Sequence, residues 1–207
     1  MGAAMKKTIL GLVIVVPITL LFVDTTIAVD STVVFMPTGR VTSQPIGHYQ
    51  FCHEYPDECS LRNTATEPVS LDEAAWHTLQ AVNNAVNESI LPATDHEIFG
   101  VEERWVYPML WGDCEDFVLL KRRMLAEAGW PLSSLLITVV LQPNGDGHAV
   151  LTVRTDRGDL ILDNLVSPIR VWNETNYLFV KRQSERDSGG WISIDDRRQI
   201  VAQNVGQ

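Results

Sequence analysis

The pattern of apolar and polar positions divides the chain into a helical part followed by a strand-rich part. Apolar residues recur with helical spacing between Ser70 and Pro92, and a second such stripe follows Cys114 and stops at Gly129. After Pro131 the pattern changes to short β-rich runs separated by turns, at residues 135–141, 148–154, 160–163, 177–180 and 191–194. Helices followed by an antiparallel meander of strands predict one α+β domain.

The first predicted helix has a clear start signal. Ser70 is followed three residues later by Glu73, which is the pattern of a capping box, so Ser70 is predicted to be the N-cap. The preceding stretch from Asp30 to Tyr49 is rich in Thr, Pro and Gly and is predicted to be irregular or extended.

The N-terminus has the pattern of a secretory signal. Lys6 and Lys7 precede an apolar run over residues 8–23, and Thr26-Ile27-Ala28 offers small residues for cleavage. Residues 1–28 are therefore predicted to be a signal peptide, and residues 29–207 a single exported domain. The alternative is an uncleaved membrane anchor, but a bilayer span needs about 20 apolar residues and this run is shorter.

The charge balance narrows the classes of partner. The 207 residues include 16 Lys and Arg against 26 Asp and Glu, a formal net charge of −10. Such a chain is a poor match for nucleic acid, whose binding relies on clustered Lys and Arg, or for anionic membrane headgroups. An acidic surface does suit hard cations or basic partners, although it also serves solubility.

Three cysteines fall into a close pair and a single residue. Cys52 and Cys59 flank a short Pro-containing loop, which in an oxidising compartment predicts a disulfide. The alternative is a metal site formed by Cys52, His53 and Cys59, although zinc usually takes four ligands at other spacings. Cys114 is then left as a free thiol.

Three residues carry the candidate chemistry. Cys114 lies at the predicted start of a helix, where backbone N–H groups favour a thiolate. His148 begins one predicted strand and Asp163 ends the next, so the carboxylate is expected to orient the imidazole beside the thiol. This arrangement performs acyl transfer. The plainer interpretation is a buried cysteine, a turn histidine and an ordinary acid at a strand end.

Three runs of sequence resemble the blocks of the bacterial transglutaminase-like cysteine proteinases, the LapG-type periplasmic proteases. They are Gly112–Asp116, Gly147–Leu151 and Leu162–Asn164, together with an upstream segment around Cys52 and Cys59. The resemblance covers residues 46 to 182. It implies a papain-like, transglutaminase-type core, with Cys114 as nucleophile, His148 as general base and acid, and Asp163 as orienting residue.

Three carboxylates flank the nucleophile: Asp113, Glu115 and Asp116. Their charges should raise the pKa of the Cys114 thiol unless a cation offsets them. The resemblance implies that Ca²⁺ bound by these side chains does so. Alternatively, Asp113 is a helix N-cap, and Glu115 and Asp116 are first-turn acids favoured by the helix dipole.

The resemblance also implies a biological role. A periplasmic, calcium-dependent cysteine endopeptidase would cut a large surface adhesin in its N-terminal region, and release of the adhesin would disperse a biofilm. An inner-membrane receptor for cyclic di-GMP would sequester the protease. Two alternatives remain: a transglutaminase or amidase with the same triad, and a catalytically silent calcium-binding module. Trp105 and Trp111 are candidates to line the cleft or donate to an oxyanion, although packing is the commoner role of such residues.

Overall fold

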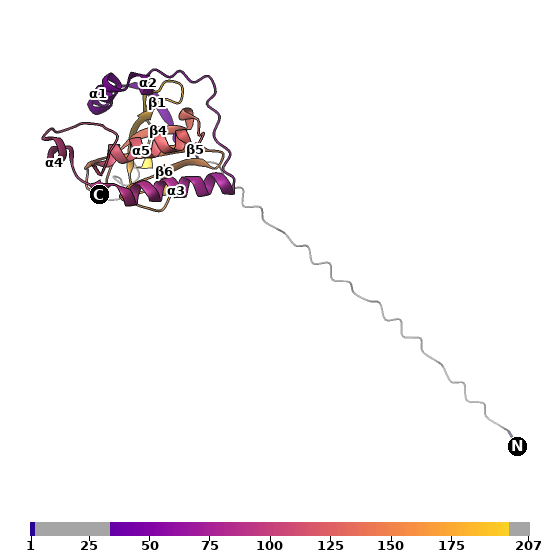
Figure 1. The fold of residues 1–207 in the computed structure, drawn as a ribbon. Helices are drawn as coiled ribbons and strands as arrows, with labels where there is room; N and C mark the ends of the chain where they lie inside the picture. The colour runs from indigo at the N-terminus through magenta and orange to yellow at the C-terminus, as the bar shows by residue number, and fades with distance from the viewer. Residues whose placement is uncertain (3–33, 199–207) are drawn as a thin grey trace, which may run out of the picture. The chain divides into compact units, whose positions relative to one another are not determined.

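One seven-stranded sheet, with strand order β1-β9-β8-β4-β5-β6-β7, positions the candidate chemistry (Figure 1). The structure is a computed structural model that describes residues 1–2 and 34–198. The strands of this sheet are β1 (Thr38–Thr42), β4 (Leu135–Leu141), β5 (Gly147–Thr155), β6 (Gly158–Leu162), β7 (Arg170–Val171), β8 (Leu178–Gln183) and β9 (Trp191–Ile194). Every pairing among them is antiparallel.

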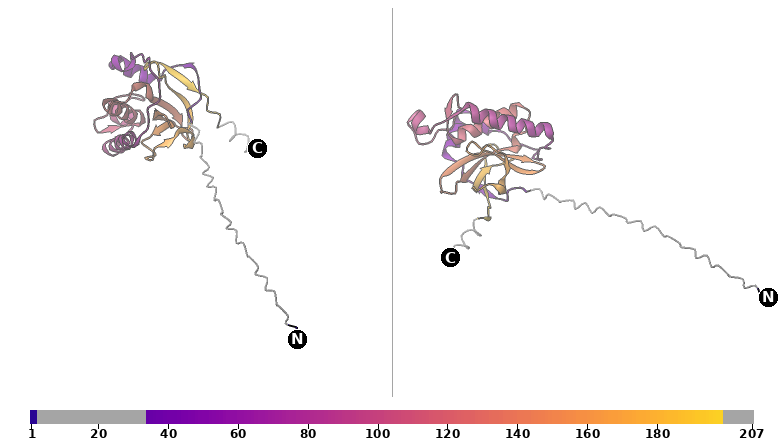
Figure 2. Two further views of the ribbon diagram at one scale, coloured as in Figure 1. Left: turned by 90° about the vertical axis from the view of Figure 1, so that its right-hand side faces the viewer. Right: turned by 90° about the horizontal axis from the view of Figure 1, so that it is seen from below.

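Helices form a second layer against the sheet. The helices are α1 (Ile46–Glu54), α2 (Pro56–Cys59), α3 (Glu73–Ser89), α4 (Asp95–Phe99) and α5 (Cys114–Glu127), and two short strands, β2 (Leu91–Pro92) and β3 (Trp111–Gly112), pair in parallel beside them. In the second view of Figure 2, α3 and α5 lie on one side and the strands on the other. Among the described residues, no helix has the length and apolar character needed to cross a bilayer.

Alternation along the strands gives the sheet two buried faces. In β5, Ala149, Leu151 and Val153 join the core cluster that includes α3 and α5, whereas Val150 joins a second cluster with Trp172 on the opposite face. Since β5 is covered on both faces, nearly all of its residues are buried, and His148 at its start brings a titratable group to the site.

The α+β class is confirmed, and the transglutaminase-like core agrees with it. The helix stop at Gly129 and the strand at 191–194 are also found. The predicted N-cap is wrong, because α3 is capped by Asp72, whose side chain accepts a hydrogen bond from Ala75 N, whereas Ser70 Oγ bonds to Asp156. A capping box does occur, at Thr94 and Glu97 of α4, which the pattern did not predict.

Two segments toward the N-terminus, residues 1–28 and 30–49, were the subject of predictions from the sequence. The stretch from Asp30 to Tyr49 was expected to be irregular or extended, but within the described part it contains β1, which pairs with β9 at the sheet edge, and the start of α1. The predicted signal peptide, residues 1–28, lies outside the described residues apart from Met1 and Gly2, so its cleavage stays a prediction.

The order of the strands departs from a simple meander. β4, β5 and β6 are neighbours in the sheet, as predicted, but β8 pairs with the other edge of β4. β9 and then β1 lie beyond β8 on that side of the sheet. β4 and β5 therefore become central strands, and the candidate histidine is carried by the middle of the sheet.

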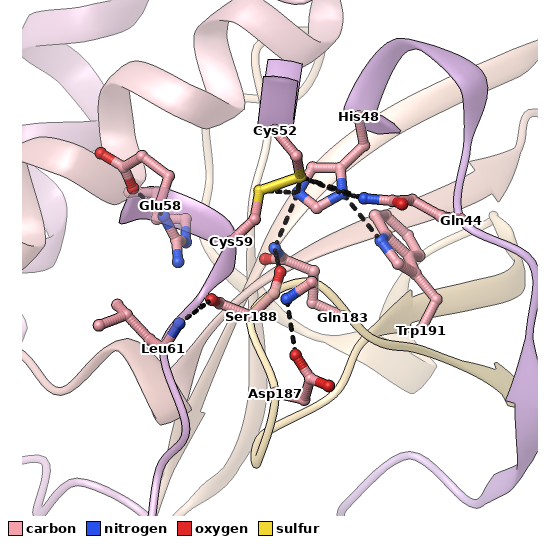
Figure 3. Close-up of a disulfide and its surroundings, with 12 residues drawn as sticks. Gln44, His48, Cys52, Glu58, Cys59, Leu61, Gln183, Asp187, Ser188 and Trp191 are labelled. Carbon is pink, nitrogen blue, oxygen red and sulfur yellow. Dashed lines mark hydrogen bonds and ion pairs between the residues drawn. A yellow bond between two sulfur atoms is a disulfide. The ribbon is translucent and has the colours of Figure 1, made fainter. Parts of the chain in front are cut away.

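A disulfide joins Cys52 of α1 to Cys59 at the end of α2, as the paired cysteines predicted (Figure 3). Beside it, Glu58 accepts hydrogen bonds from Tyr107 Oη at 2.7 Å and from Arg122 Nη1 at 2.9 Å. Since the Arg122 side chain is only 3% exposed and belongs to α5, this ion pair fixes the segment with the disulfide to the helix that begins at Cys114.

Candidate active site

His148 and Asp163 form a buried pair at one end of the sheet. Antiparallel pairing of β5 with β6 places Asp163, the residue after β6, beside the start of β5. His148 Nε2 lies 2.9 Å from Asp163 Oδ1, and each side chain is 3% exposed. This bond uses Nε2 and leaves Nδ1 as the second nitrogen of the imidazole ring. The order of the strands predicted that His148 and Asp163 lie side by side, and they do.

Further donors hold the Asp163 carboxylate. Tyr177 Oη donates to Oδ2 at 2.6 Å, and the backbone N–H of Leu165 donates to Oδ1 at 3.0 Å. Burial opposes ionisation of Asp163, but the hydrogen bonds from His148 and Tyr177 outweigh it and lower the pKa of Asp163. The carboxylate is thus held ionised and oriented toward His148.

Tyr177 is a site residue that the sequence pattern did not single out. It was expected only as the first residue of a strand, whereas it lies just before β8, and its hydroxyl bonds to Asp163. The available signal was weak: one aromatic residue after an irregular stretch does not indicate which carboxylate it meets.

Cys114 is the first residue of α5 and lines a cleft of about 440 Å³ that His148 also lines. The other walls come from Asp113, the residue before α5, Glu115 of α5, residues 147 and 149 of β5, Val139 of β4, Lys181 of β8, Pro45, Ile46, Glu103 and Trp105. The first turn of α5 and the start of β5 therefore open onto the same cleft.

Glu115 contacts the thiol directly. Cys114 Sγ donates to Glu115 Oε2 at 2.9 Å. Burial raises the pKa of the Cys114 thiol well above its ordinary value, and the Glu115 carboxylate adds to the rise. Burial and the Glu115 carboxylate thus both oppose formation of the thiolate, and a cation beside the carboxylate would offset the second effect.

Three other carboxylates gather beside the cleft. Asp95, Asp113 and Asp116 each offer an oxygen, and these oxygens lie within 4.8 Å of one another. Asp95 comes from α4. The sequence pattern did not predict its place in this group, because Asp95 lies far from Cys114 along the chain. Glu115, which the resemblance implied as a ligand, is not in this group and bonds to Cys114 Sγ instead.

The donor set of this acidic cluster suits a hard cation. Asp95 Oδ1, Asp113 Oδ1 and Asp116 Oδ2 are buried and have no hydrogen-bond partner among residues 34–198. Burial, with a contribution from neighbouring carboxylates, raises the pKa of Asp113 and of Asp116 to about 8. Asp113 occupies the N-cap position of α5, but its side chain makes no capping hydrogen bond, so the simple capping interpretation fails for it.

The family model of the bacterial transglutaminase-like cysteine proteinases matches residues 38–199. The chain belongs to this family. Among solved structures, LapG of Legionella pneumophila is 27% identical and has a TM-score of 0.48, over 63% of this chain and 74% of that chain. A calcium-bound form of the same Legionella protein is 24% identical with a TM-score of 0.46, over 68% and 77% of the two chains. No curated protein matches the sequence.

Two aromatic residues of this transglutaminase-like proteinase have different positions. Trp105 lines the cleft but is 4% exposed, and its indole Nε1–H donates to Glu103 Oε1 at 2.8 Å, so it is already bonded and packs against His48. Trp111 is 49% exposed and faces a separate apolar groove. The indole N–H of Trp105 is thus committed to Glu103, and Trp111 does not line the cleft.

The disulfide between Cys52 and Cys59 argues against the alternative metal site formed by Cys52, His53 and Cys59. The buried histidine beside Cys52 and Cys59 is His48, not His53, with ring nitrogens 3.7 to 3.9 Å from the sulfur atoms (Figure 3). Trp191 Nε1–H donates to His48 Nδ1 at 3.1 Å, and Gln183 Nε2 lies 3.1 Å from His48 Nε2, so both ring nitrogens already have protein partners. With both thiols in the disulfide and both ring nitrogens engaged, the cluster is a packed staple.

Proposed function

We propose that the protein is an exported, calcium-dependent cysteine endopeptidase that uses Cys114, His148 and Asp163 as its triad. The observation that carries the proposal is the buried His148–Asp163 pair at 2.9 Å, beside a cleft that also exposes the thiol at the start of α5. Membership of a cysteine-proteinase family supports the reaction class.

The proposed reaction begins with proton transfer from the Cys114 thiol to His148, and the sulfur attacks the carbonyl carbon of the scissile peptide. The resulting imidazolium returns the proton to the leaving amine, which departs and leaves a thioester on Cys114. His148 then removes a proton from water, the hydroxide attacks the thioester, and the free acid and thiol are restored. Asp163 keeps the imidazole oriented throughout and stabilises its charged form.

The acidic cluster is the proposed calcium site. Asp95, Asp113 and Asp116 would hold the ion, because their buried oxygens lack partners among the described residues and Ca²⁺ takes carboxylate oxygens. A bound Ca²⁺ supplies positive charge next to the first turn of α5, and this charge favours the thiolate of Cys114. The calcium-bound form of the Legionella protein is consistent with such a site in the family.

The substrate proposed from the resemblance is a large surface adhesin, and its cleavage in the N-terminal region would disperse a biofilm. An open cleft suits an extended polypeptide, and its wall carries several carboxylates, so a segment with basic or neutral residues fits better than an acidic one. The proposed compartment is the periplasm, and the Cys52–Cys59 disulfide supports export to an oxidising environment.

The proposed partner is an inner-membrane receptor that senses cyclic di-GMP. An apolar groove of about 340 Å³ between α4 and β3 offers a docking surface outside the cleft, with Met109 97% exposed and Leu110 52% exposed beside Trp111. Exposed apolar patches of this kind mark protein–protein contacts. If this groove is the docking surface, Met109→Lys should abolish receptor binding and leave cleavage by the free enzyme unchanged.

The test of the activity uses purified residues 29–207 with N-terminal fragments of candidate adhesins, with calcium or with a chelator. Discrete cleavage that needs calcium and is lost in Cys114→Ala is expected, and that variant should unfold at the wild-type temperature. Cleavage by Cys114→Ala would refute the triad. An added primary amine separates the alternative reaction: covalent incorporation of the amine without chain cleavage would indicate a transglutaminase.

A further inference from the structure

Lys181 is a half-buried lysine in the wall of the active-site cleft. It belongs to β8 and is the only Lys or Arg among the described residues that line this cleft, whereas Glu103, Asp113 and Glu115 line it with carboxylates. Lys181 Nζ donates to the backbone carbonyl of Ser43 at 2.9 Å. An ammonium group has three N–H donors, so this bond leaves two of them for a ligand in the cleft.

Within the described part of the chain, Lys181 forms no ion pair with a carboxylate. Its Nζ lies 5.8 Å from the centroid of the Trp191 ring, and the apolar side chains of Pro45, Ile46 and Val139 line the same cleft. Burial lowers the pKa of Lys181, which is the effect expected for an ammonium group that has lost water. An anionic group that entered the cleft would gain a charge-assisted hydrogen bond there.

The register of the strands fixes how far Lys181 lies from the start of β5. Val139 of β4 pairs with Ala149 of β5 on one side and with Lys181 of β8 on the other. Cross-strand partners share one face of the sheet, and Ala149 and Val139 both pack in the core cluster that includes α3 and α5. Neighbouring strands lie about 4.8 Å apart, so the backbone at Lys181 is about 10 Å from that at Ala149.

In the proposed reaction, the scissile peptide bond lies over the start of β5. His148 precedes Ala149 in this strand, and Cys114 lines the same cleft. An extended peptide advances about 3.3 Å per residue, so a peptide that runs across the strands from this point reaches Lys181 after about three residues. Between the two points it passes Val139, which is apolar and half-buried.

We propose that Lys181 is a specificity-determining residue that binds an acidic side chain of the substrate, an Asp or Glu about three residues from the scissile bond. This subsite rests on the proposed protease function, because it takes a polypeptide in the cleft. Glu103, Asp113 and Glu115 line other parts of the cleft, so the preferred segment carries one acidic residue in an otherwise neutral or basic sequence.

A purely structural role for Lys181 would come from its bond to Ser43, which joins β8 to the segment between β1 and α1. Loss of that bond would change the binding of all peptides to the same extent. Loss of a subsite would instead change only the binding of peptides that carry the acidic residue. A comparison of peptides that differ in a single charge therefore separates the two roles.

The test measures the binding of fluorescent peptides to the Cys114→Ala variant in the presence of calcium, so that cleavage does not interfere. Three pools of ten-residue peptides carry Glu, Gln or Lys at a fixed central position and neutral residues elsewhere. By fluorescence anisotropy, the Glu pool should bind about fivefold more tightly than the Gln pool, as expected for a partly exposed ion pair. Adding Lys181→Met should remove this preference, Lys181→Arg should keep it, and Lys181→Glu should transfer it to the Lys pool.

Arg157→Met is the matched control, because Arg157 is an exposed positive charge in the turn between β5 and β6, at the end of β5 away from His148. It should leave the preference for the Glu pool unchanged. A Glu pool that binds no better than the Gln pool would overturn the subsite, and so would a preference that survives in Lys181→Met.

Digestion of the Glu pool by the protein with Cys114 intact then checks the spacing. Mass spectrometry should find the cut about three residues from the Glu, and a cut at another distance would overturn the register across the strands. If the binding preference is found but neither the pools nor adhesin fragments are cleaved, the proposed protease function fails. The site for an acidic peptide at Lys181 then stands without it.

Discussion

Asp113→Asn separates a calcium site from a set of helix-terminal acids. Asp113 Oδ1 is buried without a hydrogen-bond partner among the described residues, and the side chain makes no capping bond to α5. The substitution therefore removes one charge and one potential ligand without breaking a capping interaction. Its consequences should have opposite signs with and without calcium.

The magnitude follows from the spacing of the carboxylates. Two unit charges 4.8 Å apart, the distance within which all three oxygens lie, repel by about 3 kcal/mol at an effective dielectric constant of about 20. Without a cation the cluster relieves this repulsion by holding protons or by loosening the first turn of α5, and both lower the stability of the folded state at neutral pH. Calcium at about 100 times its dissociation constant adds about 2.7 kcal/mol. In a domain of this size that is a rise of roughly 5–10 °C in melting temperature.

The assay is calorimetric unfolding at pH 7 with calcium, with magnesium and with a chelator. Wild type should show the full rise with calcium and a smaller one with magnesium, whose small octahedral shell is reluctant to lose water. Asp113→Asn should melt at or above the chelated wild type when calcium is absent, and it should gain little when calcium is added. Cleavage of an adhesin fragment should follow the same order.

Asp146→Asn is the matched control, because Asp146 lies in an exposed turn where its carboxylate accepts a bond from Asn144. It should keep the full calcium response. Equal melting temperatures for wild type with calcium and with chelator would refute the calcium site, and so would a full calcium response in Asp113→Asn. In either case the acidic cluster would be held by protons.

Three further predictions concern groups outside the acidic cluster. Tyr177→Phe removes a hydrogen bond to the ionised Asp163 and should slow cleavage roughly tenfold or more; an unchanged rate would show that the other donors suffice. Burial lowers the pKa of His48 to about 3, so the neutral ring stabilises the folded state fully above pH ~6.5. Urea unfolding should show this stability being lost as the pH falls, by about 3 kcal/mol at pH 4.5. A loss of equal size in His48→Gln would contradict this. The double variant Cys52→Ser, Cys59→Ser should lose roughly 2 kcal/mol in the same assay, and peptide mapping of wild type without reductant should link the two cysteines.

Local pattern was enough to predict the helix that begins at Cys114, the proposed nucleophile. The glycine before Asp113 and the apolar stripe after Cys114 predict a helix that starts at the cysteine, and α5 begins there. Consecutive strands with a tight turn predict antiparallel neighbours, so the approach of His148 to Asp163 followed from sequence order alone. These features depend on contacts between residues close in the chain, which sequence patterns record well.

Only the tertiary structure decided which distant groups reach the site. Asp95 joins the acidic cluster from α4, and Tyr177, just before β8, reaches Asp163. Glu115, adjacent to Cys114 in the sequence, accepts a hydrogen bond from the thiol. Lys121 occupies an ordinary polar position in the helical pattern of the sequence, and only the structure shows that it is completely buried. One sequence determines each side chain's chemistry and its local backbone. Long-range packing sets which side chains lose water together, and at this site that loss shifts the pKa values of the buried acids and of the Cys114 thiol.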